Sequence, residues 1–193
     1  MAQSGPELNW RRPVTTTDLQ ILHFQTPLDG WRGRPFRVVQ LSDFHLSKRL
    51  PLAYFEMAVQ QANHAQADMV FITGDFVTGL SCIDQLPGLL QGLQSRCGIY
   101  GILGNHDYWA DVEQVVETAQ RGGVQMLRAG GQQVDLGDGQ SVWLLGCDAP
   151  WSGARCQVPE VQAGQCVIGL SHSADYIYPL SRAGVKAVFS GHF

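Results

Sequence analysis

The sequence predicts an α/β domain in which a parallel β-α-β half is followed by a more antiparallel half. Strands and helices are expected to alternate over residues 36–121, and short strands separated by turn residues follow them. Such alternation is typical of parallel sheets with right-handed crossovers. A length of 193 residues is that of one domain. The polar segment 1–35 is interpreted as a lead-in with an edge strand around Thr17–Phe24, and the domain itself as residues 36–193.

The elements of the first half are predicted from hydrophobic spacing. Each expected strand is a short apolar run rich in β-branched residues, as in a strand buried on both faces. Each expected helix has apolar side chains three or four positions apart, as at Phe55, Val59 and Ala62. Pro51 suits the first turn of a helix, and Gly122 suits the end of one. The predicted strands are Phe36–Ser42, Asp68–Thr73 and Gly98–Leu103, and the predicted helices are Pro51–Gln66, Pro87–Leu93 and Asp111–Arg121.

The second half is predicted to contain mostly short strands. Gly137, Asp138 and Gly139 lie between two of them and form a hairpin turn signal. The expected strands are Val124–Leu127, Gln132–Leu136, Ser141–Gly146, Cys166–Leu170 and Ala187–Ser190, with a helix over Ala174–Ala183.

Composition argues against two kinds of partner. The 13 basic and 17 acidic residues give a net charge of −4, so the basic footprint of non-specific nucleic-acid binding is missing. Apolar stretches such as Val38–Leu41 are far shorter than the roughly 20 residues that span a bilayer. We therefore expect no specific nucleic-acid binding and no transmembrane segment, with peripheral membrane contact left open.

The cysteines predict a reducing environment. Their number is odd and no pair has C-x-x-C spacing, which argues against a zinc knuckle or a thioredoxin-like site. We expect reduced, mostly buried thiols in a cytoplasmic protein. The cysteines are Cys82, Cys97, Cys147, Cys156 and Cys166.

Polar side chains gather where the predicted strands end. In open α/β sheets, ligands bind in the crevice beyond the carboxyl ends of the strands. Five successive strand ends carry Asp, His or Asn, so we expect these side chains to meet in one crevice. The residues are Asp43, His45, Asp75, Asn105, His106, Asp107, His172 and His192.

These residue types match a class of metal ion. Carboxylate, imidazole and amide ligands without thiolate suit Mn, Fe, Zn or Co. Asp43 and His45 are two positions apart, so an extended backbone would turn both to one side. Asp75 could use its two carboxylate oxygens to bridge a pair of ions. Two ions about 3.5–4 Å apart hold a hydroxide and neutralise a phosphate during in-line displacement.

The ordered motifs resemble those of the calcineurin-like metallophosphoesterases. They are D-x-H at 43–45, G-D at 74–75, G-N-H-D at 104–107, a lone histidine at 172 and G-H at 191–192. The flanking sequence is similar as well, for example in "VVQLSDFHLS" and "GIYGILGNHDYW". The resemblance covers roughly Val14 to Phe193 and is strongest to the bacterial branch with YaeI- and YkuE-type phosphodiesterases.

The resemblance implies a fold, a cofactor and a reaction. The family fold is a four-layer α-β-β-α sandwich of two mixed sheets. The implied cofactor is two divalent transition metal ions. The implied reaction is hydrolysis of a phosphodiester or pyrophosphate bond by a metal-bridging hydroxide, on a phosphoester that is lipid- or nucleotide-linked in some family members. The alternatives are a pyrophosphatase of the UDP-2,3-diacylglucosamine type from lipid A synthesis, and an inactive scaffold on the same fold.

The resemblance also implies a role for each site residue. Asp43 and His45 would hold the first metal ion, and Asp75 would bridge both ions. His106 would protonate the leaving oxygen or stabilise the phosphate oxygens, and Asp107 would orient His106. The remaining ligands, all of the second ion, would be Asn105, His172 and His192.

The last motif differs from the family pattern. The family has G-H-x-H, whereas this sequence has Gly191, His192 and Phe193 and then stops. The resemblance therefore implies a C-terminally truncated domain, in which the first metal site lacks one histidine and the second sheet lacks its last strands.

Overall fold

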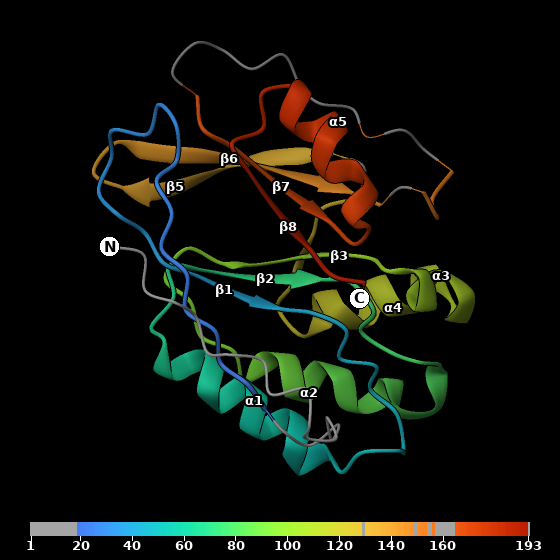
Figure 1. The fold of residues 1–193 in the computed structure, drawn as a ribbon. Coiled ribbons are helices and arrows are strands. Elements are labelled where there is room, and N and C mark those ends of the chain that lie inside the picture. Colours follow the sequence, from blue (N-terminus) through green and yellow to red (C-terminus); the bar gives the residue numbers. More distant parts are fainter. Residues whose placement is uncertain (1–18, 129, 149, 154–155, 157–164, 193) are drawn as a thin grey trace, which may run out of the picture.

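The structure is a computed structural model that describes residues 19–128, 130–148, 150–153, 156 and 165–192. Its helices and strands form four layers (Figure 1). Two four-stranded sheets stack face to face. One set of helices covers the outer face of the first sheet, and a single helix covers the outer face of the second: α1 (Leu52–His64), α2 (Leu86–Gln91) and α4 (Val112–Arg121) on the first, and α5 (Ile177–Arg182) on the second. The predicted α-β-β-α fold class is confirmed.

The first sheet has the strand order β1-β2-β3-β4 and is parallel throughout. The expectation of two mixed sheets is therefore wrong for this sheet, because every connection within it is a crossover of the β-α-β type. Its elements in chain order are β1 (Val38–Leu41), α1 (Leu52–His64), β2 (Met69–Thr73), a 3₁₀ helix (Leu80–Gln85), α2 (Leu86–Gln91), β3 (Ile99–Ile102), α3 (Asn105–Ala110), α4 (Val112–Arg121) and β4 (Gln125–Met126).

The second sheet has the order β5-β6-β7-β8 and is mixed. Strands β5 and β6 form an antiparallel hairpin, and β6, β7 and β8 run parallel. Asp138 and Gly139 at the hairpin turn both have positive φ, 55° and 71°, which is the type I′ geometry that favours Asp-Gly. Its elements are β5 (Gly131–Gly137), β6 (Gln140–Cys147), β7 (Val167–Ser171), a 3₁₀ helix (Ala174–Tyr176), α5 (Ile177–Arg182) and β8 (Ala187–Ser190).

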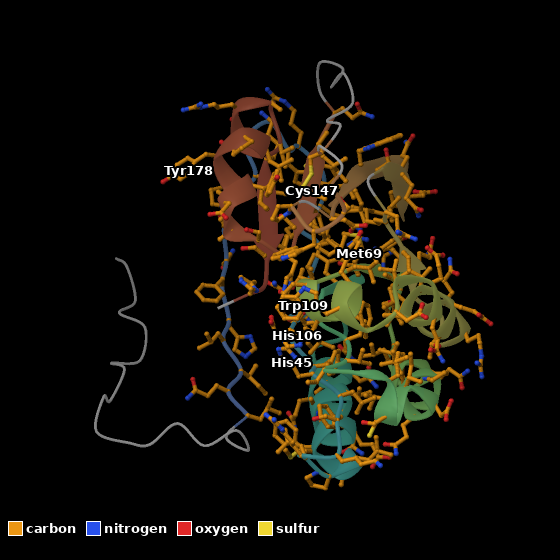
Figure 2. All side chains as sticks on the ribbon, turned by 90° about the vertical axis from the view of Figure 1, so that its right-hand side faces the viewer. His45, Met69, His106, Trp109, Cys147 and Tyr178 are labelled. Carbon is orange, nitrogen blue, oxygen red and sulfur yellow. A yellow bond between two sulfur atoms is a disulfide. The ribbon has the colours of Figure 1, made fainter. Side chains whose placement is uncertain are left out.

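Strand β2 shows how the layers are held together. All five of its residues are buried, as expected of a central parallel strand. Val70 and Ile72 pack into the core under α1, α2 and α4, whereas Met69 and Phe71 pack into the core between the sheets. Successive side chains of a strand point to opposite faces, so one strand contributes to both cores. Met69 is labelled in Figure 2.

Two local features differ from the sequence prediction. No helix was predicted between Leu103 and Asp111, but Asn105 to Ala110, which include most of the G-N-H-D motif, form the short helix α3. The edge strand expected around Thr17–Phe24 is wrong for residues 19–24, which carry no regular secondary structure; residues 1–18 lie outside the described part. The apolar side chains of that segment are exposed, Phe24 at 88%, so no neighbouring strand stabilises it.

The prediction of reduced cysteines is wrong for one pair. Cys147 at the end of β6 forms a disulfide with Cys156, nine residues later (Figure 2). The spacing of the two cysteines matches no local motif, so the sequence did not indicate this pairing. Cys82, Cys97 and Cys166 are free thiols. Among the described residues, none of the helices is long and apolar enough to cross a membrane.

Candidate metal centre

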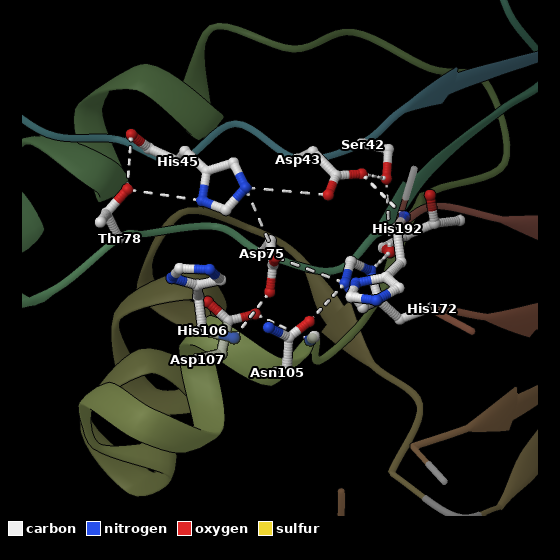
Figure 3. A network of polar contacts seen from close by, with 12 residues as sticks. Ser42, Asp43, His45, Asp75, Thr78, Asn105, His106, Asp107, His172 and His192 are labelled. Atoms are coloured by element: carbon white, nitrogen blue, oxygen red, sulfur yellow. Dashed lines mark hydrogen bonds and ion pairs between the residues drawn. The ribbon is translucent and has the colours of Figure 1, made fainter. Parts of the chain in front are cut away.

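The carboxyl ends of the strands of both sheets meet at one place, and the expected side chains lie there together (Figure 3). The first sheet contributes residues after β1, β2 and β3, and the second contributes residues after β7 and β8. They are Asp43 and His45, Asp75, Asn105 to Asp107, His172 and His192.

Asp75 lies at the centre of the cluster and is only 1% exposed. Its Oδ1 accepts a hydrogen bond of 2.9 Å from the His106 amide. Its Oδ2 lies 3.5 Å from His45 Nε2 and 3.4 Å from His172 Nε2. Burial raises the pKa of Asp75, but the hydrogen bond and charge of His172, the His106 amide and the charge of His45 together lower it below its usual value. The carboxylate form is therefore the stable one.

The separations around Asp75 fit ligands that share an ion. N–H···O hydrogen bonds usually measure about 2.7–3.2 Å, so the contacts of 3.4 and 3.5 Å are long for hydrogen bonds. Two ligand atoms that each bind one ion at about 2.1 Å lie roughly 3.0–3.4 Å apart. Among the described residues, Asp75 belongs to two sets of potential ligands, one with His45 and His106 and the other with His172 and His192. Within each set, the ligand atoms all lie within 4.8 Å of one another.

His172 supplies the clearest sign that a cation belongs here. The ring is 0% exposed, and its Nδ1 donates a hydrogen bond of 2.6 Å to the Thr73 carbonyl. In the neutral ring, Nε2 is then an acceptor, and it faces Asp75 Oδ2 and Asn105 Oδ1, the latter at 3.2 Å. With the Asn105 amide oriented in this way, three buried acceptors face one another, and a cation between them would be stabilised by all three.

A proton on His172 would also compensate for these acceptors. Burial lowers the pKa of His172, but the Asp75 hydrogen bond, the Thr73 carbonyl and the charges of Asp75 and Asp43 outweigh burial and raise it. The same groups that would stabilise an imidazolium would stabilise a divalent ion. The hydrogen bond from His172 Nδ1 to the Thr73 carbonyl also fixes the tautomer in which Nε2 is free to act as a ligand. Metal-binding histidines are commonly supported by a hydrogen bond of this kind.

On the other side of Asp75, the cluster contains two histidines. His45 Nε2 lies 3.8 Å from Asp43 Oδ1, and its Nδ1 lies 3.4 Å from Thr78 Oγ1. The rings of His45 and His106 are in edge contact, with centroids 4.6 Å apart. The sequence assigned Asp43 as a ligand and His106 as an acid; the geometry brings His106 as close to Asp75 and His45 as a ligand would be.

Several site residues have a backbone conformation that the sequence did not reveal. Asp43, His45, Asp75 and His192 have φ of 54°, 45°, 55° and 56°, in the left-handed region that non-glycine residues rarely adopt. The extended backbone expected at Asp43 and His45 is therefore wrong, although both side chains still reach the cluster. Such strain persists only where the surrounding structure holds it, and it concentrates at functional sites.

Glycines allow the loops to approach one another. A Cβ on Gly104 would collide with the Asp75 side chain, and one on Gly74 would lie 2.6 Å from His172 Nδ1. Gly74 has a φ of 95° as well. Substitution at either position would push a candidate ligand out of place.

Asp107 is fully buried beneath the motif that carries His106. Its carboxylate accepts hydrogen bonds from the amides of Gly104 at 2.9 Å and Val77 at 3.2 Å. Burial raises its pKa to about 7, against the opposing effect of these amides. Asp107 thus holds the backbone beside His106 in place and orients the His106 ring indirectly.

Asp148, directly after β6, is a buried carboxyl group outside both ligand sets, and the sequence did not single it out. It is 2% exposed and accepts hydrogen bonds from the Leu103 amide at 3.5 Å and the Tyr108 hydroxyl at 3.3 Å. Arg128 Nε lies 3.8 Å from the same carboxylate. Burial raises the pKa of Asp148 to about 6. Its position just after a strand, which it shares with Asp43 and Asp75, was the available signal.

Comparisons with known proteins agree with this geometry. The family profile described as Calcineurin-like phosphoesterase matches residues 36–193. The chain is 31% identical over 142 residues to the uncharacterized metallophosphoesterase YkuE of Bacillus subtilis, a match that covers 70% of this chain and 48% of that protein. It is 27% identical over 106 residues to an uncharacterized metallophosphoesterase of Aquifex aeolicus, covering 54% and 40%.

A third relative has a named activity. The chain is 34% identical over 74 residues to the UDP-2,3-diacylglucosamine pyrophosphatase LpxG of Chlamydia muridarum, covering 37% of this chain and 22% of that protein. In each of these three comparisons the matched part of the relative is less than half of its length.

Proposed function

Because the chain belongs to the calcineurin-like phosphoesterase family, we propose that it hydrolyses a phosphodiester or pyrophosphate bond with the help of two divalent metal ions. The observation that carries the proposal is the convergence of three buried acceptors on one point, from Asp75, Asn105 and His172. A phosphoester hydrolase of this kind needs a concentrated positive charge beside the scissile bond, and these residues would hold it.

The proposed ligands divide between the two ions around Asp75. Asp43, His45 and Asp75 would hold the first ion. Oxygen and imidazole ligands without thiolate suit Mn, Fe, Zn or Co. When bound, the ions supply Lewis acidity, which neutralises the phosphate oxygens and activates a water for in-line attack. The second ion would be held by Asp75, Asn105, His172 and His192.

His106 is proposed to hold a proton for the leaving oxygen. It is half-buried on α3, beside Asp75 and in ring contact with His45. A proton donor must lie within hydrogen-bond reach of the departing oxygen, and a ring at the edge of the ion cluster meets this need. Asp107 keeps that ring in place through the Gly104 amide.

One alternative substrate class has specific support. The similarity to LpxG favours a pyrophosphate that links a nucleotide to a lipid. An inactive scaffold on the same fold is less favoured, because a scaffold has no use for the buried Asp107 and the His106 that it supports.

The cellular compartment is also a proposal. The net charge of −4 gives no support to a nucleic-acid partner. The Cys147–Cys156 disulfide favours an oxidising compartment over the cytoplasm that the cysteine pattern predicted, since disulfides are rare in the cytosol. Peripheral membrane contact stays open.

The test is a metal-dependent hydrolysis assay on the purified chain. Protein stripped with a chelator is assayed with bis(p-nitrophenyl) phosphate, p-nitrophenyl phosphate and UDP-2,3-diacylglucosamine, before and after addition of Mn²⁺, Co²⁺ or Zn²⁺. We expect turnover of at least one of the three only after metal is added. Absence of metal-dependent turnover of all three would contradict the proposal, and metal-independent turnover would contradict the role of the ions.

A further inference from the structure

Trp109 is an exposed aromatic side chain at the edge of the candidate metal centre. It lies on α3 and is 69% exposed. Its ring packs on that of His106, with centroids 4.8 Å apart and planes tilted by 56°. Figure 2 shows Trp109, His106 and His45 beside one another.

The fold gains little from an indole at this position. A tryptophan that stabilises a fold buries most of its surface in a core. The preceding residue of the helix does so: Tyr108 packs against the core under the first sheet and donates a hydrogen bond to Asp148. Trp109 instead leaves most of its ring in solvent and makes its aromatic contact with His106.

The place of Trp109 follows from the role of His106. If His106 protonates the leaving oxygen, the group attached to that oxygen must extend away from the ions on the His106 side. Trp109 packs on the His106 ring and leaves most of its own surface in solvent, so it is placed to meet that group. A flat ring in the leaving group would stack on the indole of Trp109, whereas a small alkyl group would leave the indole exposed to solvent.

The opposite side of the cluster is built differently. Trp151 contacts the rings of His172 and His192, with centroids at 5.2 and 5.3 Å, but it is half-buried. Its contacts serve to pack the histidines of the second ion. Trp109 therefore offers more exposed aromatic surface beside the cluster than Trp151 does.

We propose that Trp109 binds the leaving group, and that the substrates of this site are phosphoesters whose leaving group carries a flat ring. This inference rests on the proposed function, because it takes the position of the leaving oxygen from the role of His106. It adds the chemical class of the leaving group. An aryl alcohol and a nucleoside both present such a ring, so the test must separate these two sources.

The experiment measures binding of inert probes to the Mn²⁺-loaded protein by calorimetry. Phenylphosphonate and methylphosphonate carry the same charged group and differ in the ring. Adenosine 5′-monophosphate and ribose 5-phosphate differ in the base. The variants are Trp109→Ala, Trp109→Phe, which keeps a flat ring, and Tyr178→Ala as a control, since Tyr178 is an aromatic side chain on α5 with 76% exposure (Figure 2).

We expect the wild-type protein to bind the ring-bearing member of at least one pair about 10-fold more tightly than its partner. Trp109→Ala should abolish this preference without weakening methylphosphonate binding, Trp109→Phe should keep most of it, and Tyr178→Ala should keep all of it. A preference within the phosphonate pair alone identifies an aryl leaving group, and a preference for the adenosine probe identifies a nucleoside.

Equal affinities within both pairs for the wild-type protein, or a ring preference that survives Trp109→Ala, would overturn the inference about Trp109. Failure of the proposed function has a different signature: the wild-type protein would not hydrolyse any of the three test esters with metal, whatever its preference among the inert probes.

Discussion

Replacing Asp75 by Asn should disable both metal sites at once. The two side chains have nearly the same shape, and the amide oxygen could still accept the 2.9 Å hydrogen bond from the His106 amide. What is lost is the negative charge between His45 Nε2 and His172 Nε2, at 3.5 and 3.4 Å. Removal of groups that merely support a ligand costs about 10–100-fold in metal affinity, so loss of a shared ligand should cost more than about 100-fold at each site.

The assay is calorimetric titration of the stripped protein with Mn²⁺, combined with thermal unfolding. An ion present at about 100 times its Kd stabilises the folded state by about 2.7 kcal/mol, so Mn²⁺ should raise the Tm of the wild-type protein but not that of Asp75→Asn. Asp148→Asn is the matched control, because Asp148 is also a buried carboxyl group, 2% exposed, and lies outside both ligand sets. If Asp75→Asn binds two ions as the wild type does, or if Asp148→Asn loses them equally, the assignment of Asp75 is refuted.

Three further outcomes follow from the structure. His106→Ala should lower kcat by about 10²–10⁴-fold while the bound metal, measured by atomic absorption, stays constant; loss of metal would identify His106 as a ligand instead of a proton donor. Asp148 has a pKa of about 6 in the folded protein against an ordinary 3.8, so its contribution to stability is present below pH 4 and lost as the pH rises through 6. In urea unfolding, the free energy of unfolding of the wild type should fall by about 3 kcal/mol relative to that of Asp148→Asn between pH 4 and pH 7. The same pH dependence of the free energy of unfolding in both proteins would contradict the raised pKa of Asp148. Cys156→Ser should lower the free energy of unfolding by about 2–3 kcal/mol, the closure entropy of a short loop, whereas no change under oxidising conditions would show that the bond does not form.

The layers of the fold were predictable because their signals are local. Runs such as Met69–Thr73 are apolar throughout, and the helix over Val112–Arg121 is bounded by Asp111, whose side chain accepts from the Gln114 amide, and by Gly122. Spacing and end residues of this kind act within a few positions of the chain. The parallel order of the first sheet followed from the alternation of these elements.

What the sequence could not reveal depends on contacts between distant segments. The left-handed backbone at Asp43 arises where its amide donates to the Gly74 carbonyl, and no local pattern encodes that contact. The Cys147–Cys156 bond and the burial of Asp148 depend likewise on how the chain folds back after β6. The G-N-H-D motif is recognisable in the sequence, but its helical form as α3 is not, because four polar or small residues after a strand are typical of a loop.

A crystal structure of the chain soaked in Mn²⁺, with anomalous differences recorded near the manganese edge, would show whether two ions share Asp75. The expected result is two peaks about 3.5–4 Å apart with the Asp75 carboxylate between them, one beside His45 and the other beside His172 and His192. A single peak, or peaks that do not contact Asp75, would contradict it.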